Sequence, residues 1–326
     1  MTWAGLVLAL VGHVVFSFVD PSITESSGLV DLGRSMVTAN DSGDAPVLYT
    51  VDARSGRTIG RTTYADRVYD VEALAPGRGP SAGSIWVGDI GDNDERRSSV
   101  RVYRVVPGAG SRRVRAASYD LVYPDGAHDA ESLVVGPRGR LVVITKGLLG
   151  GTVYAAPPVL STAHPNRLIA VARVGIWATD AALFPDGRHV LVRGYGTAAI
   201  YTFPRFVPVA TLDLPHQRQG EGVSIGDSGR IRLSSEGRNS AVLEVTLPAD
   251  VRAVLAGAPL PSARPSATTP LAGTEHPGEH SSHPASGARG RLLGIAIGAG
   301  SAGVLLLLAL LRPWRPRRVT RPPEAP

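Results

Sequence analysis

The acidic and amide side chains between Gly88 and Arg97 form the densest group of chemically useful residues in the chain. This stretch reads GDIGDNDERR and contains Asp89, Asp92 and Asn93, whose oxygens are the type of ligand that calcium prefers. It does not match the EF-hand loop, which needs oxygens at positions one, three and five and a glycine at six. Three interpretations stay open: a metal site, a catalytic site, or a polar turn whose Asp and Asn bond to the backbone.

A second acidic pattern recurs along the chain. Five segments each begin with a short polar or acidic element and an apolar pair, and continue as strand, turn and strand. The aligned positions, separated by 45, 59, 50 and 40 residues, are Ser27, Glu72, Glu131, Ala181 and Glu221. The two-residue alternation of a half-buried strand is clearest in VRVYRVV, Val100 to Val106.

Repeats of about 40 to 50 residues with four strands each are typical of the blades of a β-propeller. A β-sandwich would not repeat in this way, and a helical solenoid would need a period of 3.6 residues. We therefore predict an all-β chain whose ectodomain is a propeller of five blades. A sixth, degenerate blade within the long unit between Glu72 and Glu131 is an alternative.

The order of strands in a blade predicts where these residues meet. The first strand lines the channel, and the connections before it and after the second strand reach the same face. The candidate ligand-facing residues on that face are Glu72, Glu131, Glu221, Asp89, Asp92, Asn93, Lys146, Arg193 and Glu236. Asp41, Asp70, Asp129 and Asp180 are expected beside them, and His128 is interpreted as structural. Because the chain has no cysteine, such an oxygen-rich face suits a hard cation such as calcium, with Glu72, Glu131 and Asp92 as candidate ligands.

The composition predicts the order of domains. Residues 1–20 are expected to be a signal peptide or signal anchor, because an apolar run of suitable length occupies them. The propeller is expected over 21–250. A stalk rich in Pro, Ser and Thr follows over 251–290, because it has too few apolar residues to form a core. A transmembrane helix over 291–312 and a basic cytoplasmic tail over 313–326 complete the chain.

The transmembrane helix is predicted from twenty uncharged residues between Leu292 and Leu311. At about 1.5 Å per residue, such a helix spans the roughly 30 Å hydrocarbon core of a bilayer. Five arginines follow it, so the positive-inside rule places the C-terminus in the cytoplasm and the propeller outside the cell. These arginines account for most of the net charge of +6, and the nearly neutral remainder argues against a nucleic-acid partner.

The elements DVEAL with GDIGDN, and YPDGAHDAESLVV with VVITKG, carry a family resemblance. They resemble the exported propellers of actinobacteria, and residues 22–247 are more loosely similar to the SdiA-regulated and esterase-like-phytase propeller families. The resemblance implies a calcium-supported propeller with Lys146 ending a strand beside its ligand-facing glutamates. Those glutamates would correspond to Glu72, Glu131 and Glu221. The fourth repeat departs from the pattern, because Ala181 replaces the glutamate and Arg193 occupies the turn.

Three functions remain open at this stage. The favoured one is a surface-anchored module that binds a wall polymer, a small ligand or a neighbouring protein through the acidic face. The second is a metal-dependent hydrolase of phosphoesters or lactones, in which calcium polarises the substrate and Lys146 and Arg193 stabilise negative charge. The third is a purely structural propeller. The sequence contains no G-x-S-x-G, H-E-x-x-H or P-loop motif, so no catalytic residue is assigned.

Overall fold

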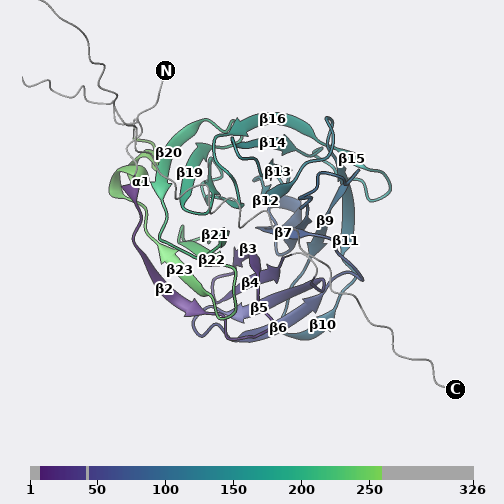
Figure 1. Ribbon diagram of the computed structural model, residues 1–326, viewed down its shortest axis with the longest axis horizontal. Helices are drawn as coiled ribbons and strands as arrows, with labels where there is room; N and C mark the ends of the chain where they lie inside the picture. The colour runs from purple at the N-terminus through teal and green to yellow at the C-terminus, as the bar shows by residue number, and fades with distance from the viewer. Residues whose placement is uncertain (1–7, 42–43, 259–326) are drawn as a thin grey trace, which may run out of the picture. The chain divides into compact units, whose positions relative to one another are not determined.

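The computed structural model describes residues 8–41 and 44–258, which fold into five antiparallel sheets around a central channel (Figure 1). The first blade contains β3 (Ser26–Asp31), β4 (Ser35–Asn40), β5 (Val47–Asp52) and β6 (Thr58–Thr63). The second contains β7 (Val71–Pro76), β8 (Ile85–Asp89), β9 (Val100–Val105) and β11 (Ala117–Val122). The third contains β12 (Ala130–Val135), β13 (Leu141–Thr145), β14 (Gly151–Ala155) and β16 (Ile169–Val174).

The last two blades complete the ring. The fourth blade contains β17 (Asp180–Leu183), β18 (His189–Arg193), β19 (Thr197–Thr202) and β20 (Pro208–Asp213). The fifth contains β21 (Gly220–Ile225), β22 (Ile231–Ser235), β23 (Ala241–Val245) and β2 (Gly12–Ser17). A 3-10 turn covers Gly79–Ser81, and a short helix, α1, covers Ala249–Leu255. The predicted all-β propeller with five blades is confirmed.

The repeat found in the sequence corresponds to the inner wall of the channel. Each of the five aligned segments opens the first strand of a blade, namely β3, β7, β12, β17 and β21. Each of these strands contacts the first strand of the next blade, and β21 contacts β3, so the inner ring is closed. Because neighbours cover both faces of an inner strand, all residues of β12 and β13 are buried, whereas the outer strand β6 alternates between buried and exposed residues.

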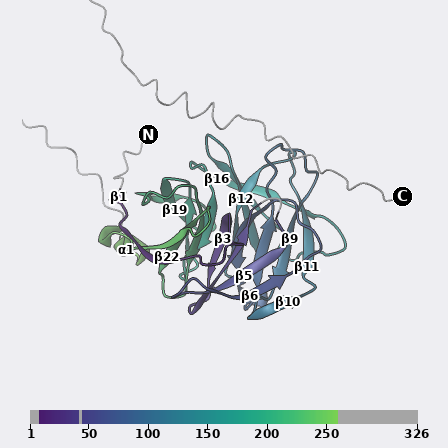
Figure 2. The same ribbon diagram turned by 60° about the horizontal axis from the view of Figure 1, so that its bottom comes forward.

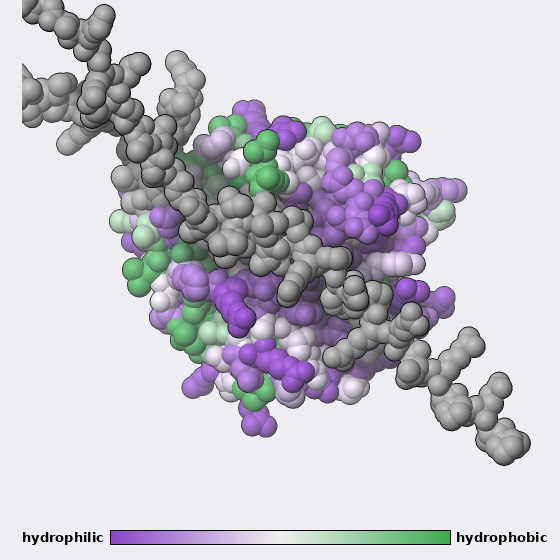
Figure 3. All heavy atoms as spheres, viewed as in Figure 1, coloured by the Kyte–Doolittle hydropathy of each residue, from purple (hydrophilic) through white to green (hydrophobic). Residues whose placement is uncertain are grey.

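Five apolar clusters hold the blades together, one between each pair of neighbours. The cluster between blades two and three, for example, joins Trp86 and Val102 to Leu133 and Val143. The other four fill the remaining interfaces. The face of the propeller seen in Figure 3 is mostly hydrophilic, with scattered hydrophobic groups. The driving force for folding therefore lies between the sheets, where apolar surface is removed from water.

The N-terminal segment closes the ring. Strand β2 pairs antiparallel with β23 and becomes the outermost strand of blade five, and Phe16 and Phe18 pack into the cluster between blades five and one. Residues 8–20 therefore pack as part of the propeller, which the sequence predicts over 21–250. The export role predicted for residues 1–20 stays a prediction.

Three short strands attach neighbouring blades at their outer edges. Strands β1 (Leu8–Ala9), β10 (Gly110–Arg113) and β15 (Asn166–Arg167) pair in parallel with β20, β6 and β11 of the preceding blades. In the side view of Figure 2, β10 lies beside β6 at the rim. These additions cover sheet edges that would otherwise present unpaired backbone groups.

No helix within residues 8–41 and 44–258 is long and apolar enough to cross a membrane. Of the stalk predicted over 251–290, residues 251–255 belong to helix α1, whose Val251 is buried in the cluster between blades four and five. The rest of the stalk from residue 259, the transmembrane helix predicted over 291–312 and the basic tail predicted over 313–326 lie outside the described residues. Those assignments stay predictions.

Candidate functional site

A β-bulge marks the repeated acidic position in four of the five blades. The ladder between the first and second strands shifts register at Ser27, Glu72, Glu131 and Glu221. Blade four carries Ala181 at this position, and its ladder is regular. A bulge leaves one residue outside the ladder and re-aims its side chain. The recurring glutamate is therefore tied to a recurring backbone irregularity at one end of the channel, which we call the channel mouth.

The residue that follows the second strand reaches the channel mouth in three blades. The residues that close the ladder opposite the start of the first strand are Asn40, Asp89, Thr145, Arg193 and Ser235. All five are buried. The next residue in blades one, three and five is Asp41, Lys146 and Glu236, respectively. Neighbouring residues of a strand point to opposite sides. The ladder-closing residue is therefore buried, whereas the residue after it reaches the channel mouth.

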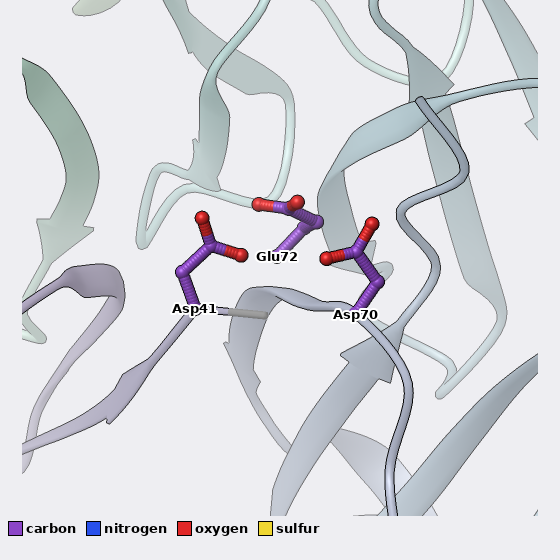
Figure 4. Close-up of side chains that lie close together, drawn as sticks. All are labelled: Asp41, Asp70 and Glu72. Atoms are coloured by element: carbon purple, nitrogen blue, oxygen red, sulfur yellow. The ribbon is translucent and has the colours of Figure 1, made fainter. Parts of the chain in front are cut away.

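Three carboxylates from blades one and two meet at the mouth. Asp41 follows β4, Asp70 precedes β7 and Glu72 occupies the bulge in β7, and one ligand oxygen of each lies within 4.8 Å of the other two. Figure 4 shows the three side chains pointing toward a common space. Glu72 is buried and accepts a hydrogen bond from the Ser27 hydroxyl at 3.2 Å. Hard cations such as calcium favour such a set of oxygens, so these residues fit a metal ion.

A lysine lies on the side of the channel mouth that blades three and four form. Lys146 forms an ion pair with Glu131, and its ammonium group also lies 6.0 Å from the ring centre of Trp177 and 5.7 Å from that of Tyr195. Trp177 and Tyr195 come from the connections before β17 and after β18. Sequence reasoning missed both aromatic residues, although their loop positions in the repeat would have placed them on this face.

Burial and mutual repulsion raise the pKa values of the acidic groups at the mouth. Burial is the main reason why the pKa of Glu221 rises to about 8 and that of Glu131 to about 7. The charge of Glu131 raises the pKa of Glu221 further, whereas Lys146 lowers the pKa of Glu131. Burial, and then the charges of Asp41 and Glu25, raise the pKa of Glu236 to about 7. The pKa of Glu72 is raised by burial and then by Glu131.

The stretch GDIGDNDERR is a structural turn beside the channel mouth. Asp89 accepts hydrogen bonds from the backbone N–H groups of Tyr69 and Asp70 at 3.2 and 3.1 Å, and pairs with Arg97 at 2.9 Å. Asp92 accepts the backbone N–H of Arg97 at 2.7 Å. Local bonds of this kind are the usual reason for Asp in turns. Asn93, at the exposed tip, is the remaining candidate in this stretch. The structure brings Glu72 together with Asp41 and Asp70, and not with Asp92.

Arg193 is a structural residue in this geometry. It was expected to face a ligand, but it is completely buried. Its guanidinium donates to the carbonyls of Gly222 and Ser234 at 2.5 and 2.8 Å and to the side-chain oxygen of Gln217 at 2.6 Å. It therefore ties blade four to blade five, and the role of stabilising negative charge on a substrate does not suit it.

Comparisons with known proteins leave the function to be argued from this geometry. No protein-family model matches the chain, and no curated protein matches it. Among solved structures, the chain is similar to hydrazine synthase of Kuenenia stuttgartiensis at 14% identity and a TM-score of 0.36. The match covers 67% of this chain and 58% of that chain, so the chain spans less than two thirds of its length. A similarity at this level carries no functional argument.

Proposed function

We propose that this protein is a binding module whose channel mouth holds a calcium ion and, around it, a ligand. The observation that carries the proposal is the convergence of Asp41, Asp70 and Glu72 within 4.8 Å. Two like charges 4 Å apart repel by about 4 kcal/mol at an effective dielectric constant of 20. A divalent cation among them would turn this repulsion into attraction, which is why such an arrangement suits a metal.

Lys146 does not replace the cation. Its ammonium group is committed to Glu131, on the side of the mouth formed by blades three and four. The charge of Lys146 reaches Glu72, but burial and the neighbouring acids raise the pKa of that carboxyl more strongly, so a cation bound among these three carboxylates would stabilise their charged form. Calcium suits them better than zinc or copper, since the group offers hard carboxylate oxygens and neither cysteine nor histidine.

The binding module is favoured over a metal-dependent hydrolase. The hydrolase mechanism needs basic groups free to stabilise negative charge that develops on the substrate. Both terminal nitrogens of Arg193 donate to backbone and amide oxygens, and the charge of Lys146 is balanced by Glu131. What remains at the mouth is a set of acceptors and one candidate metal position, which supports recognition of a ligand.

The proposed location is the outer surface of the cell membrane, as in the propellers of actinobacteria that the sequence resembles. The support is the apolar run over 292–311 and the five arginines after it. A protease added to intact cells is expected to cut the predicted stalk beyond helix α1, over 259–290, and release the propeller. Release only after the cells are broken would place the propeller in the cytoplasm and contradict this location.

Calcium is expected to bind the full-length protein in detergent and to raise its unfolding midpoint. At a calcium concentration 100 times the dissociation constant, the gain is about 2.7 kcal/mol, or about 5 to 10 °C for a domain of this size. Folded-state pKa values above those of free carboxyls mean that the folded protein binds more protons than the unfolded chain between about pH 5 and 8. Without calcium, stability therefore falls as the pH rises through this window. Burial also raises the pKa of the proposed ligand Glu72, and calcium must displace its proton, so the effect of calcium should be larger at pH 8 than at pH 5.5.

Two variants make this test of calcium binding specific. Glu72→Gln keeps the shape of the side chain but removes its charge, and is expected to weaken calcium binding by at least about tenfold, equivalent to about 1.4 kcal/mol. Asp94→Asn is the control, because Asp94 lies exposed in the GDIGDNDERR turn and pairs with Arg96. Equal calcium affinity in the Glu72→Gln variant and the original protein would refute the proposed site.

A further inference from the structure

An aromatic pair borders the mouth on the side away from the three carboxylates. Trp177 and Tyr195 meet edge to face, with ring centres 5.7 Å apart and planes at 89°. Trp177 keeps 40% of its surface exposed, although the described part of the propeller buries its other tryptophan, Trp86, almost completely. A large aromatic surface that is left in water beside polar groups is a common property of binding sites.

The cation that these rings attract is already present. Lys146 lies 6.0 Å from the Trp177 ring centre and 5.7 Å from the Tyr195 ring centre, which is within the usual range of cation–π contacts. An ammonium ligand would meet the charge of Lys146 at this place. An ammonium group has three N–H donors, of which Glu131 accepts one and the Tyr195 hydroxyl engages a second. Lys146 can therefore also donate to an oxygen of a ligand.

A buried acceptor lies beside the lysine. Glu221 is only 5% exposed. Within residues 8–41 and 44–258, its carboxylate oxygens accept no hydrogen bond and form no ion pair. The charges of Glu131 and Lys146 act on it strongly, so it belongs to this part of the mouth. These oxygens are not fully enclosed by the protein, so they can accept hydrogen bonds from a ligand at the mouth. Glu221 thus points to a ligand that donates hydrogen bonds.

We propose that the blade three and blade four side of the mouth binds a ring of a neutral carbohydrate. Its apolar C–H face would stack on Trp177, one hydroxyl would donate to the carboxylate of Glu221, and another would accept from Lys146. This inference rests on the proposed binding function and names its ligand class. A neutral sugar suits the site because carboxylates require donors, the exposed aromatic ring requires a flat apolar face, and the excess of acidic groups disfavours an anionic ligand.

The test uses the full-length protein in a detergent without a sugar headgroup and a panel of methyl glycosides of common neutral hexoses and pentoses. Saturation-transfer difference NMR detects binding, and its titration gives the affinity in the original protein and in every variant. At least one neutral glycoside is expected to bind. The corresponding methyl uronosides, which are anionic, should bind at least about tenfold more weakly to this acidic mouth.

Variants separate stacking from general damage to the fold. Trp177→Ala is expected to weaken the affinity for the glycoside by at least tenfold, whereas Trp177→Phe, which keeps an aromatic face, should stay within a few-fold of the original. Glu221→Gln should also weaken binding. Val159→Ala is the control, because Val159 is exposed in the connection after β14. Absence of binding to every neutral glycoside, or unchanged affinity in Trp177→Ala, would overturn the inference.

Calcium binding distinguishes this failure from failure of the proposed function. Trp177→Ala should bind calcium as the original protein does, because the three carboxylates come from blades one and two. Calcium binding without any glycoside binding would overturn the carbohydrate inference alone. Glycoside binding without calcium binding would support the carbohydrate site and contradict the calcium part of the proposed function.

Discussion

A chain that starts after Asp20 is expected not to form a closed, cooperatively unfolding propeller. The deletion removes β2, the outermost strand of blade five, and with it the ladder to β23. It also removes Phe16 and Phe18 from the cluster between blades five and one, where Phe18 is completely buried. The loss of one large buried aromatic side chain alone costs about 3 to 5 kcal/mol, which is comparable to much of the stability of a typical domain.

Denaturant unfolding of truncated and substituted full-length proteins measures this effect. Removal of residues 1–7 is the matched control, because the described strands begin at Leu8, and it should leave the midpoint unchanged. Phe18→Ala should lower the free energy of unfolding by about 3 to 5 kcal/mol. A chain from residue 21 that unfolds cooperatively at the same denaturant concentration as the original would contradict ring closure by β2.

Arg193→Ala is expected to destabilise the propeller by about 3 to 5 kcal/mol. The substitution leaves the carbonyls of Gly222 and Ser234 without their donor, and leaves Asp180, which is completely buried, without a neighbouring positive charge. Arg193→Lys should recover only part of the loss, because a lysine cannot reproduce the planar fork of donors. Thermal unfolding measures the difference.

The exposed Arg188, in the hairpin between β17 and β18, provides the control, and Arg188→Ala should change stability by less than about 0.5 kcal/mol. A fold of unchanged stability in Arg193→Ala would contradict the structural role. If such a stable variant also lost activity toward a phosphoester or lactone, the hydrolase interpretation would regain its main basic residue.

The sequence predicts the inner ring of the propeller better than its outer edge. The first strands recur with an acidic or polar residue at one position in four of the five blades, and the spacing of the repeat locates all five. Strand β2 is hidden because GHVVFS is an apolar run with no partner nearby in the sequence. The same residues suit the apolar core of an export signal, and their pairing with β23, more than 220 residues away, follows only from closure of the ring.

The structure gathers only some of the predicted candidate residues at the channel mouth. Glu72 was chosen as a metal ligand, and the structure joins it to Asp41 and Asp70. Asp92 and Arg193 resemble functional residues in the sequence, but they bond to local backbone groups. Arg193 lies opposite Asp180 in blade four, just as Thr145 lies opposite Ala130 in blade three. Arg193 is therefore equivalent to Thr145, and Lys146 lies one residue further along the chain. A shift of one residue turns a side chain to the other side of the strand, and composition alone does not reveal it.

A calcium anomalous difference map would test the metal position most directly. Crystals of the compact unit that ends at Ala263, grown with calcium, are expected to show one peak among the carboxylates of Asp41, Asp70 and Glu72, with oxygen ligands at about 2.3 to 2.6 Å. The Glu72→Gln protein should lose this peak. A map with no peak between these three residues at a calcium concentration that saturates the protein would contradict a calcium site at the channel mouth.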